Sequence, residues 1–96
     1  MTRRSKRDPL KSLKDTLRRY GLTIPDYHQK LKAQHYGCAI CGNADFGGLR
    51  LSVDHDHQTG AVRGLLCTGC NVGLGHFRED PEVLIKAADY LIQHTI

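Results

Sequence analysis

Two aspartates and two histidines alternate over four residues, Asp54, His55, Asp56 and His57, just before a Thr-Gly turn signal. Carboxylate oxygens are ligands that hard cations such as Mg²⁺ prefer. A neutral imidazole beside them can take a proton from water. A fold gains little from four titratable groups packed so closely. The stretch therefore carries the parts for a metal-assisted hydrolysis.

All four cysteines fall in two C-x-x-C pairs, Cys38 with Cys41 and Cys67 with Cys70, separated by 25 residues. A tight turn brings the sulfurs of such a pair about 3.7 Å apart, which matches one edge of a tetrahedron around Zn²⁺. Disulfides are one alternative, but they need an oxidising compartment, and the N-terminus lacks the apolar segment of an export signal. A redox dithiol is another, but it would need one pair in a βαβ pattern. We predict a structural zinc, because four thiolates leave no open position for chemistry.

The acid–histidine stretch lies between the two cysteine pairs, so the zinc would fix both ends of the segment that carries it. His55 and His57 are not expected to bind that zinc, which already has four sulfurs. A second metal, acid–base chemistry or plain surface remain as their roles. Asn71 directly follows the last cysteine, and its amide oxygen together with Asp54 makes a hard ligand pair suited to Mg²⁺.

Two helices are predicted before the first cysteine pair. The first starts at Asp8, followed by Pro, and ends at Gly21. The second starts at Thr23 and ends near Gly37, so that the two form a helical arm over residues 8–36. The apolar positions of the arm, expected to be core contacts, are Leu10, Leu13, Leu17, Tyr27 and Leu31.

Alternating residues predict a β-hairpin after the first cysteine pair, with strands over 49–53 and 61–66 and a turn over 54–60. A helix follows from about Gly69, and a last helix starts at Asp80 with an apolar stripe. That stripe consists of Leu84, Ala87, Ala88 and Leu91. Neighbours in a regular strand point to opposite faces, so Asp54 and His55 can share a site only if the strand bulges or ends there.

The net charge of +4 is unevenly spread. Residues 1–32 hold ten lysines and arginines against three aspartates, whereas residues 33–96 hold four against seven acidic residues. A basic arm on a mildly acidic body favours a polyanion partner, although a solubilising helix face with a disordered tail is an alternative. No apolar run approaches the roughly 18 residues that a membrane span needs, so no membrane partner is expected.

The segment 53-VDHDHQTGAVRGLLCTGCN-71, preceded by 38-CAICG-42, resembles the recombination endonuclease VII family of HNH, or ββα-metal (His-Me finger), endonucleases. The resemblance covers roughly residues 20–92. It implies an α+β fold, a small zinc-stapled ββα-metal domain with N-terminal helices and a C-terminal helix. The domain would span residues 8–96 behind a flexible basic tail, 1–7.

The resemblance also implies roles for the site residues. Asp54 and Asn71 would bind a catalytic Mg²⁺, or Mn²⁺ in its place. His55 would be the general base, and His57 would contact the scissile phosphate. Cys38, Cys41, Cys67 and Cys70 would bind the structural zinc. Asp56 either orients a histidine or lies in solvent, and His28, His35, His76 and His94 are expected on the surface or in the core.

The implied function is a metal-dependent DNA endonuclease that nicks duplex or branched DNA. The alternative is a non-catalytic zinc module that binds nucleic acid, and a third option is a protein-interaction zinc domain. Longer relatives dimerise through further helices, so a homodimer stays open for this chain. The expected location is the cytoplasm, or the host cytoplasm if the protein is encoded by a phage.

Overall fold

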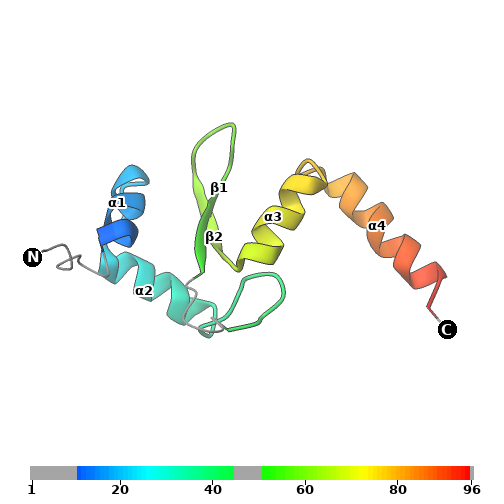
Figure 1. The fold of residues 1–96 in the computed structure, drawn as a ribbon, viewed down its shortest axis with the longest axis horizontal. Helices are drawn as coiled ribbons and strands as arrows, with labels where there is room; N and C mark the ends of the chain where they lie inside the picture. The colour runs from blue at the N-terminus through cyan, green and yellow to red at the C-terminus, as the bar shows by residue number, and fades with distance from the viewer. Residues whose placement is uncertain (1–10, 45–50, 96) are drawn as a thin grey trace, which may run out of the picture.

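The computed structural model describes residues 11–44 and 51–95. The elements follow in the order α1 (Lys11–Arg19), α2 (Ile24–Ala33), β1 (Ser52–His55), β2 (Val62–Leu66), α3 (Thr68–His76) and α4 (Pro81–Gln93). Figure 1 shows α1 and α2 on one side of the hairpin, with α3 and α4 leading away on the other. The predicted α+β class is confirmed, and the hairpin and α3 follow one another in the predicted ββα order. The predicted tail at 1–7, the helix start at 8–10 and the strand start at 49–50 lie outside the described residues.

The start of α2 is set by a reciprocal cap. The Asp26 amide donates to the Thr23 hydroxyl over 3.2 Å, and the Thr23 amide donates to the Asp26 carboxylate over 2.9 Å. Pro25 fits the first turn, because its missing amide hydrogen would have no partner there. Before this cap, Gly21 turns the chain with a φ of 71°, as the predicted stop to α1 requires.

The end of α2 differs from the prediction. The helix ends at Ala33 rather than near Gly37, because His35 and Tyr36 take positive φ angles of 56° and 62°. The Gln34 side chain then bonds outside the helix. Its amide nitrogen donates to the Gly37 carbonyl over 2.8 Å and to the Leu65 carbonyl over 2.9 Å. Its oxygen accepts from the Leu65 amide over 2.9 Å, so one side chain joins α2 to β2.

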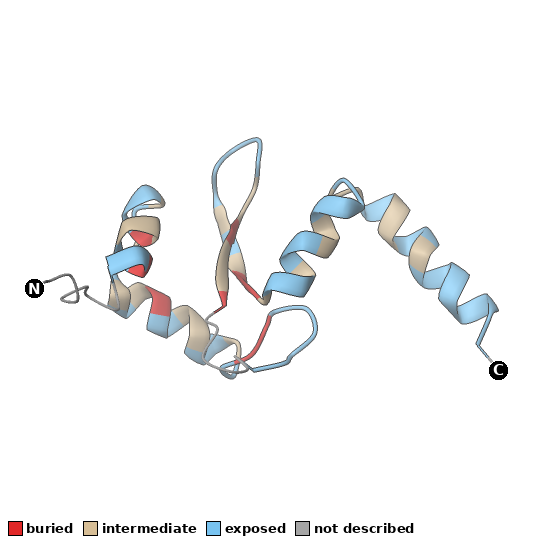
Figure 2. Cartoon of the chain, in the orientation of Figure 1, coloured by how far each residue is buried: buried red, intermediate tan, exposed pale blue. Residues whose placement is uncertain are grey.

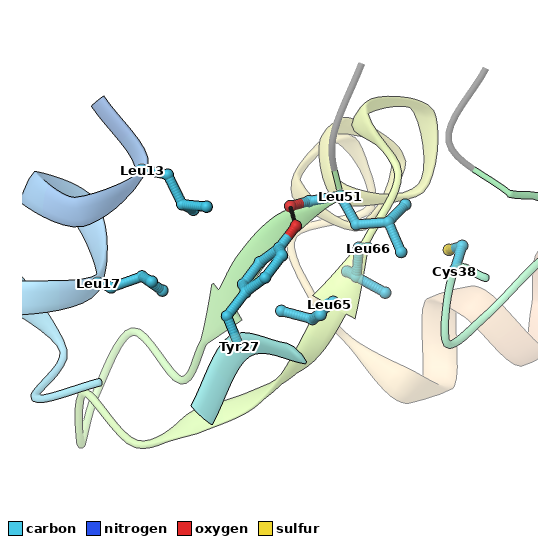
Figure 3. Packing of buried hydrophobic residues seen from close by; sticks show 7 residues of the cluster. All are labelled: Leu13, Leu17, Tyr27, Cys38, Leu51, Leu65 and Leu66. Atoms are coloured by element: carbon cyan, nitrogen blue, oxygen red, sulfur yellow. Dashed lines mark hydrogen bonds between the residues drawn. The ribbon is translucent and has the colours of Figure 1, made fainter. Parts of the chain in front are cut away.

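The core lies between the two N-terminal helices and the hairpin. Its buried residues are Leu13, Leu17, Tyr27, Cys38, Leu51, Leu65 and Leu66. Figure 3 shows the Tyr27 side chain reaching across to Leu51, whose carbonyl accepts from the Tyr27 hydroxyl over 2.7 Å. The predicted core role is confirmed for Leu13, Leu17 and Tyr27, whereas Leu31 is only half-buried against the cluster. This packing holds the hairpin base against α1 and α2.

The two C-terminal helices contribute little to this core. Neither α3 nor α4 contains a fully buried residue, and α4 is largely exposed in Figure 2. The predicted apolar stripe of α4 is half-buried at Leu84 and Ala87 and exposed at Ala88 and Leu91. None of the helices in 11–44 and 51–95 is long and apolar enough to cross a membrane.

The hairpin is irregular beside Asp54 and His55, where a bulge or a strand end was predicted. Asp54 pairs with Gly64, but His55 pairs with Val62, so Arg63 is an extra residue on β2. This register shift is a β-bulge, and it falls between Asp54 and His55. The extra residue lies on β2, so the bulge changes the direction of Arg63, whereas β1 itself has no inserted residue and ends at His55.

Candidate functional site

The two cysteine pairs converge on one point. Their four Sγ atoms lie within 4.8 Å of one another, and those of Cys41 and Cys67 are 3.7 Å apart. None of the four forms a disulfide. Such separations suit the edges of a tetrahedron of sulfurs around Zn²⁺. The cluster is thus a candidate structural zinc site made of all four predicted residues.

Local backbone geometry prepares both pairs. The Cys38 amide donates to the Asn43 carbonyl over 2.9 Å, and the Gly42 amide donates back to the Cys38 carbonyl over 2.9 Å. This turn needs glycine twice, since Gly42 has a φ of 76° and a Cβ on Gly37 would lie 2.4 Å from the Gly42 carbonyl oxygen. The second pair opens α3, where the Cys67 sulfur accepts from the Cys70 amide over 3.4 Å.

The thiols sit in contrasting environments. Burial acts to raise the pKa of Cys38, but the backbone N–H groups of Cys67, Cys41 and Ile40 outweigh it and hold that pKa at about 6. Burial, followed by the neighbouring sulfurs, raises the pKa of Cys70 to about 12. Thiolates this close repel one another unless a cation neutralises them. The donor set therefore fits a dication such as zinc.

A second set of side chains meets at the hairpin. We refer to it as the hairpin network; it consists of Tyr20, Asp54, His55, His57, Arg63 and Glu79. Three of its members were predicted as site residues, and three were not. Its members come from the end of α1, from both strands and the turn between them, and from the connection between α3 and α4.

Asp54 and Arg63 form the buried end of the network. Arg63 Nε lies 2.7 Å from Asp54 Oδ2, and Arg63 Nη2 lies 3.0 Å from Asp54 Oδ1. The Asp54 side chain is only 8% exposed, whereas that of Arg63 is 39% exposed. The hydrogen bonds that Arg63 donates to Asp54, joined by the one that it donates to Glu79, raise the pKa of Arg63 above its usual value. Because Arg63 is the extra residue of the bulge, the bulge places this guanidinium on the carboxylate.

Glu79 links the arginine to a histidine. Its Oε1 accepts from Arg63 Nη2 over 3.1 Å, and its Oε2 lies 3.0 Å from His57 Nε2. The His57 side chain is 68% exposed, so it remains open to a ligand while Glu79 holds one of its ring nitrogens.

His55 sits between His57 and an aromatic side chain from the end of α1. Its ring stacks on that of His57, with centroids 5.0 Å apart and planes 12° apart. Its Nδ1 lies 3.1 Å from the Tyr20 hydroxyl. When Nδ1 carries the proton it donates to this oxygen, which leaves the Nε2 lone pair free to accept a proton. The arrangement thus suits a general base.

Asn71 stands apart from the hairpin network. It lies exposed on α3, and its amide donates to the Cys67 carbonyl over 2.9 Å. Within the described ranges its side chain makes no hydrogen bond, so the structure does not join it to Asp54. Asn71 is a helical residue of α3.

Asp56 has a role that neither sequence alternative named. Its Oδ1 accepts from the Gln58 amide over 2.7 Å and from the Thr59 amide over 3.1 Å. These N–H groups lower the pKa of Asp56. The carboxylate therefore caps the hairpin turn. The remaining four histidines are all exposed, namely His28, His35, His76 and His94.

Sequence reasoning missed Tyr20, Arg63 and Glu79 as site residues. Arg63 had a usable signal, since it lies across the hairpin from the first aspartate. Glu79 and Tyr20 had none in their local pattern, because they reach the histidines from other elements.

The donors at Asp54 still fit a hard cation. Each carboxylate oxygen has two lone-pair directions, and Arg63 occupies one on each oxygen. The free directions leave Asp54 able to bind a divalent ion, with the guanidinium as a competing positive charge.

Comparison with known proteins places these features in one family. The model of that family, recombination endonuclease VII, matches residues 14–93. The Gene 59 protein of Mycobacterium phage D29 is 51% identical over 73 residues, which are 75% of this chain and 44% of that protein. The Gene 59 protein of Mycobacterium phage L5 is 49% identical over 74 residues, 76% of this chain and 45% of that protein. The chain thus spans less than half the length of these relatives, and no solved structure matches it significantly. The chain belongs to the recombination endonuclease VII family.

Proposed function

We propose that this chain is a metal-dependent DNA endonuclease of the HNH type, which hydrolyses phosphodiester bonds in duplex or branched DNA. The observation that carries the proposal is the hairpin network, which links two stacked histidines through Glu79 and Arg63 to a buried carboxylate at a bulge. Membership of the endonuclease family supports the same reaction class.

In this proposal the two histidines have different roles. His55 is the general base: its Nδ1–H forms a hydrogen bond to the Tyr20 hydroxyl, and its Nε2 takes a proton from the attacking water. His57 contacts the scissile phosphate. Glu79 and the stacked ring of His55 hold the His57 ring in one orientation, which lowers the entropy lost on binding.

Asp54 and Asn71 would hold Mg²⁺, with Mn²⁺ as a substitute. When bound, the ion would supply positive charge to the phosphate and to the leaving oxygen. Asp54 is supported by its burial and its free lone pairs. Asn71 is supported by its ligand chemistry and by its anchoring one residue after Cys70.

The zinc in this proposal has a structural role. With zinc bound, the four cysteines tie the turn after α2 to the start of α3, on either side of the hairpin. We expect about one zinc per chain, and loss of the fold in Cys67→Ser.

DNA contact would involve the basic side of α1. Lys11, Lys14, Arg18 and Arg19 are all exposed on this nine-residue helix. Asp15 pairs with two of them, Lys11 at 3.2 Å and Arg18 at 3.9 Å, so the helix stays strongly basic. Such a surface favours the phosphate backbone without regard to sequence. Action in the cytoplasm of a phage host and assembly as a homodimer also stay predictions.

Nicking of supercoiled plasmid by zinc-loaded protein tests this function. We expect nicked circles when Mg²⁺ is added, none when Mg²⁺ is left out, and about 10²-fold slower nicking when His55→Ala replaces the wild type. The zinc content is measured in each sample, so that loss of the fold is not mistaken for loss of chemistry. DNA binding without nicking by the wild-type protein would favour the non-catalytic zinc module instead.

A further inference from the structure

A pocket of about 440 Å³ adjoins the hairpin network on the side of the α3–α4 connection. The hairpin turn supplies Asp56 and His57 to its lining, β2 supplies Arg63, and the connection supplies Arg78 and Glu79. The pocket therefore shares three residues with the network and adds a second arginine that the proposed reaction does not use.

The acidic groups in this pocket are already engaged. Asp56 accepts two amide hydrogens of the hairpin turn, and Glu79 is bound to Arg63 and His57. Arg63 is in turn held by Asp54. Arg78 differs: it is exposed, and among residues 11–44 and 51–95 its guanidinium makes no hydrogen bond or ion pair. Among the described residues, the pocket thus holds one cationic side chain without a partner, Arg78, in the same lining as His57.

The backbone holds Arg78 there at a cost. Arg78 and Glu79 have φ angles of 57° and 54°, which place two consecutive side chains in the left-handed region. Glycine usually occupies such a position after a helix, because it has no Cβ to strain. The Glu79 amide donates to the Leu74 carbonyl over 2.8 Å, and this hydrogen bond closes the left-handed turn. Strained non-glycine residues cluster at functional sites, so the turn adds to the evidence from the pocket.

From the pocket, its uncommitted arginine and the strained turn, we propose that Arg78 binds a DNA backbone phosphate next to the scissile one. This inference rests on the proposed function, in which His57 contacts the scissile phosphate. Successive phosphates of one strand are spaced about 3.4 Å along the helix axis. A strand held at His57 therefore carries a neighbouring phosphate to the adjoining pocket. A planar guanidinium with several donors is well suited to a phosphate oxygen pair.

The test compares Arg78→Gln with Lys86→Gln, which removes an exposed positive charge from α4 at a residue outside the pocket lining. Affinity for a short duplex is measured by fluorescence anisotropy without Mg²⁺, over a range of salt concentrations. Arg78→Gln should weaken binding about tenfold and reduce the slope of log affinity against log salt by about one. Lys86→Gln should stay within about twofold of wild type. Equal effects of the two substitutions would overturn the proposal.

Two further measurements test whether Arg78 contacts a single phosphate. In a series of duplexes, one phosphate at a time is replaced by an uncharged methylphosphonate. At one position the replacement should weaken DNA binding by the wild type and leave binding by Arg78→Gln unchanged. Arg78→Gly should raise the melting temperature, because it relieves the left-handed strain, and yet weaken DNA binding as Arg78→Gln does. A glycine variant that binds DNA as the wild type does would refute the phosphate contact.

Failure of this inference can be told from failure of the proposed function. If the wild type nicks plasmid but Arg78→Gln binds DNA normally, the pocket assignment is wrong and the nuclease stands. If the wild type does not nick but Arg78→Gln alone weakens binding, the phosphate contact stands in a DNA-binding protein.

Discussion

Replacement of Arg63 by methionine tests whether Asp54 is a buried carboxylate that can accept a cation. The substitution keeps an unbranched chain of similar length and removes both hydrogen bonds to Asp54, at 2.7 and 3.0 Å. Loss of one partner from a fully buried ion pair costs about 3–5 kcal/mol. Because the Arg63 side chain is 39% exposed, water screens the pair, and we expect about 2 kcal/mol. For a domain of this size that lowers the melting temperature by about 8–16 °C.

A divalent cation should reverse part of this loss. The unpaired carboxylate of the Arg63→Met variant is a better site for Mg²⁺ than the paired one, since no guanidinium competes. At a concentration ten times the dissociation constant, binding to the native state adds about 1.4 kcal/mol. Mg²⁺ should therefore raise the melting temperature of Arg63→Met by more than it raises that of the wild type.

The assay is thermal unfolding of zinc-loaded protein with and without Mg²⁺, followed by circular dichroism. Arg18→Met is the matched control, because the Arg18 side chain is 80% exposed and its contact to Asp15 is 3.9 Å long. Adding Asp54→Asn to Arg63→Met should abolish the rescue by Mg²⁺. Equal melting temperatures of Arg63→Met and Arg18→Met would refute the proposed pairing. So would an equal rise in the melting temperatures of the wild type and Arg63→Met on addition of Mg²⁺.

Three other substitutions probe the supports of the site. Tyr20→Phe should lower the single-turnover cleavage rate about tenfold and leave the DNA affinity unchanged. This effect is a fraction of the 10²–10⁴-fold contribution of positioned acid–base catalysis. An unchanged rate would show that Tyr20 does not assist His55. Gln34→Leu leaves buried backbone groups of β2 unsatisfied, so urea unfolding should show a loss of about 2–3 kcal/mol, and a loss under 0.5 would contradict this. Asp56→Asn should speed amide hydrogen exchange in the hairpin turn near neutral pH. Because the pKa of Asp56 is lowered in the folded state, its carboxylate stabilises the fold above its unfolded pKa of about 3.9. This stabilisation is lost as the pH falls through the folded pKa. A difference in exchange rate between Asp56→Asn and the wild type that persists below that pH would contradict the prediction.

Features set by nearby residues were well predicted from the sequence. Caps and turns formed by neighbours placed the start of α2 at Thr23 and the break after α1 at Gly21. The two C-x-x-C pairs predicted that all four cysteines meet, because a structural zinc takes four ligands, and their Sγ atoms do lie within 4.8 Å of one another. Strand geometry alone also predicted a bulge or a strand end beside Asp54; β1 ends at His55, and the bulge lies opposite it on β2.

Features set by distant contacts could not be predicted in this way. The end of α2 depends on Gln34, which bonds to β2 across 31 positions of sequence. Glu79 meets Arg63 and His57 only because two left-handed residues turn the chain after α3. The polar partners of Asp54 and His55 are therefore properties of the folded chain and not of the motif that contains them.

Single-turnover cleavage tests whether His55 is the general base of a DNA-cleaving site. A labelled duplex or junction is cut with saturating zinc-loaded protein and Mg²⁺, with wild type and His55→Ala compared across pH. DNA affinity and zinc content are measured in parallel. We expect that His55→Ala binds DNA normally but cuts about 10²-fold more slowly or worse, and that only the wild-type rate rises with pH before levelling. Cleavage by His55→Ala at the wild-type rate, with the same pH profile, would contradict this role of His55.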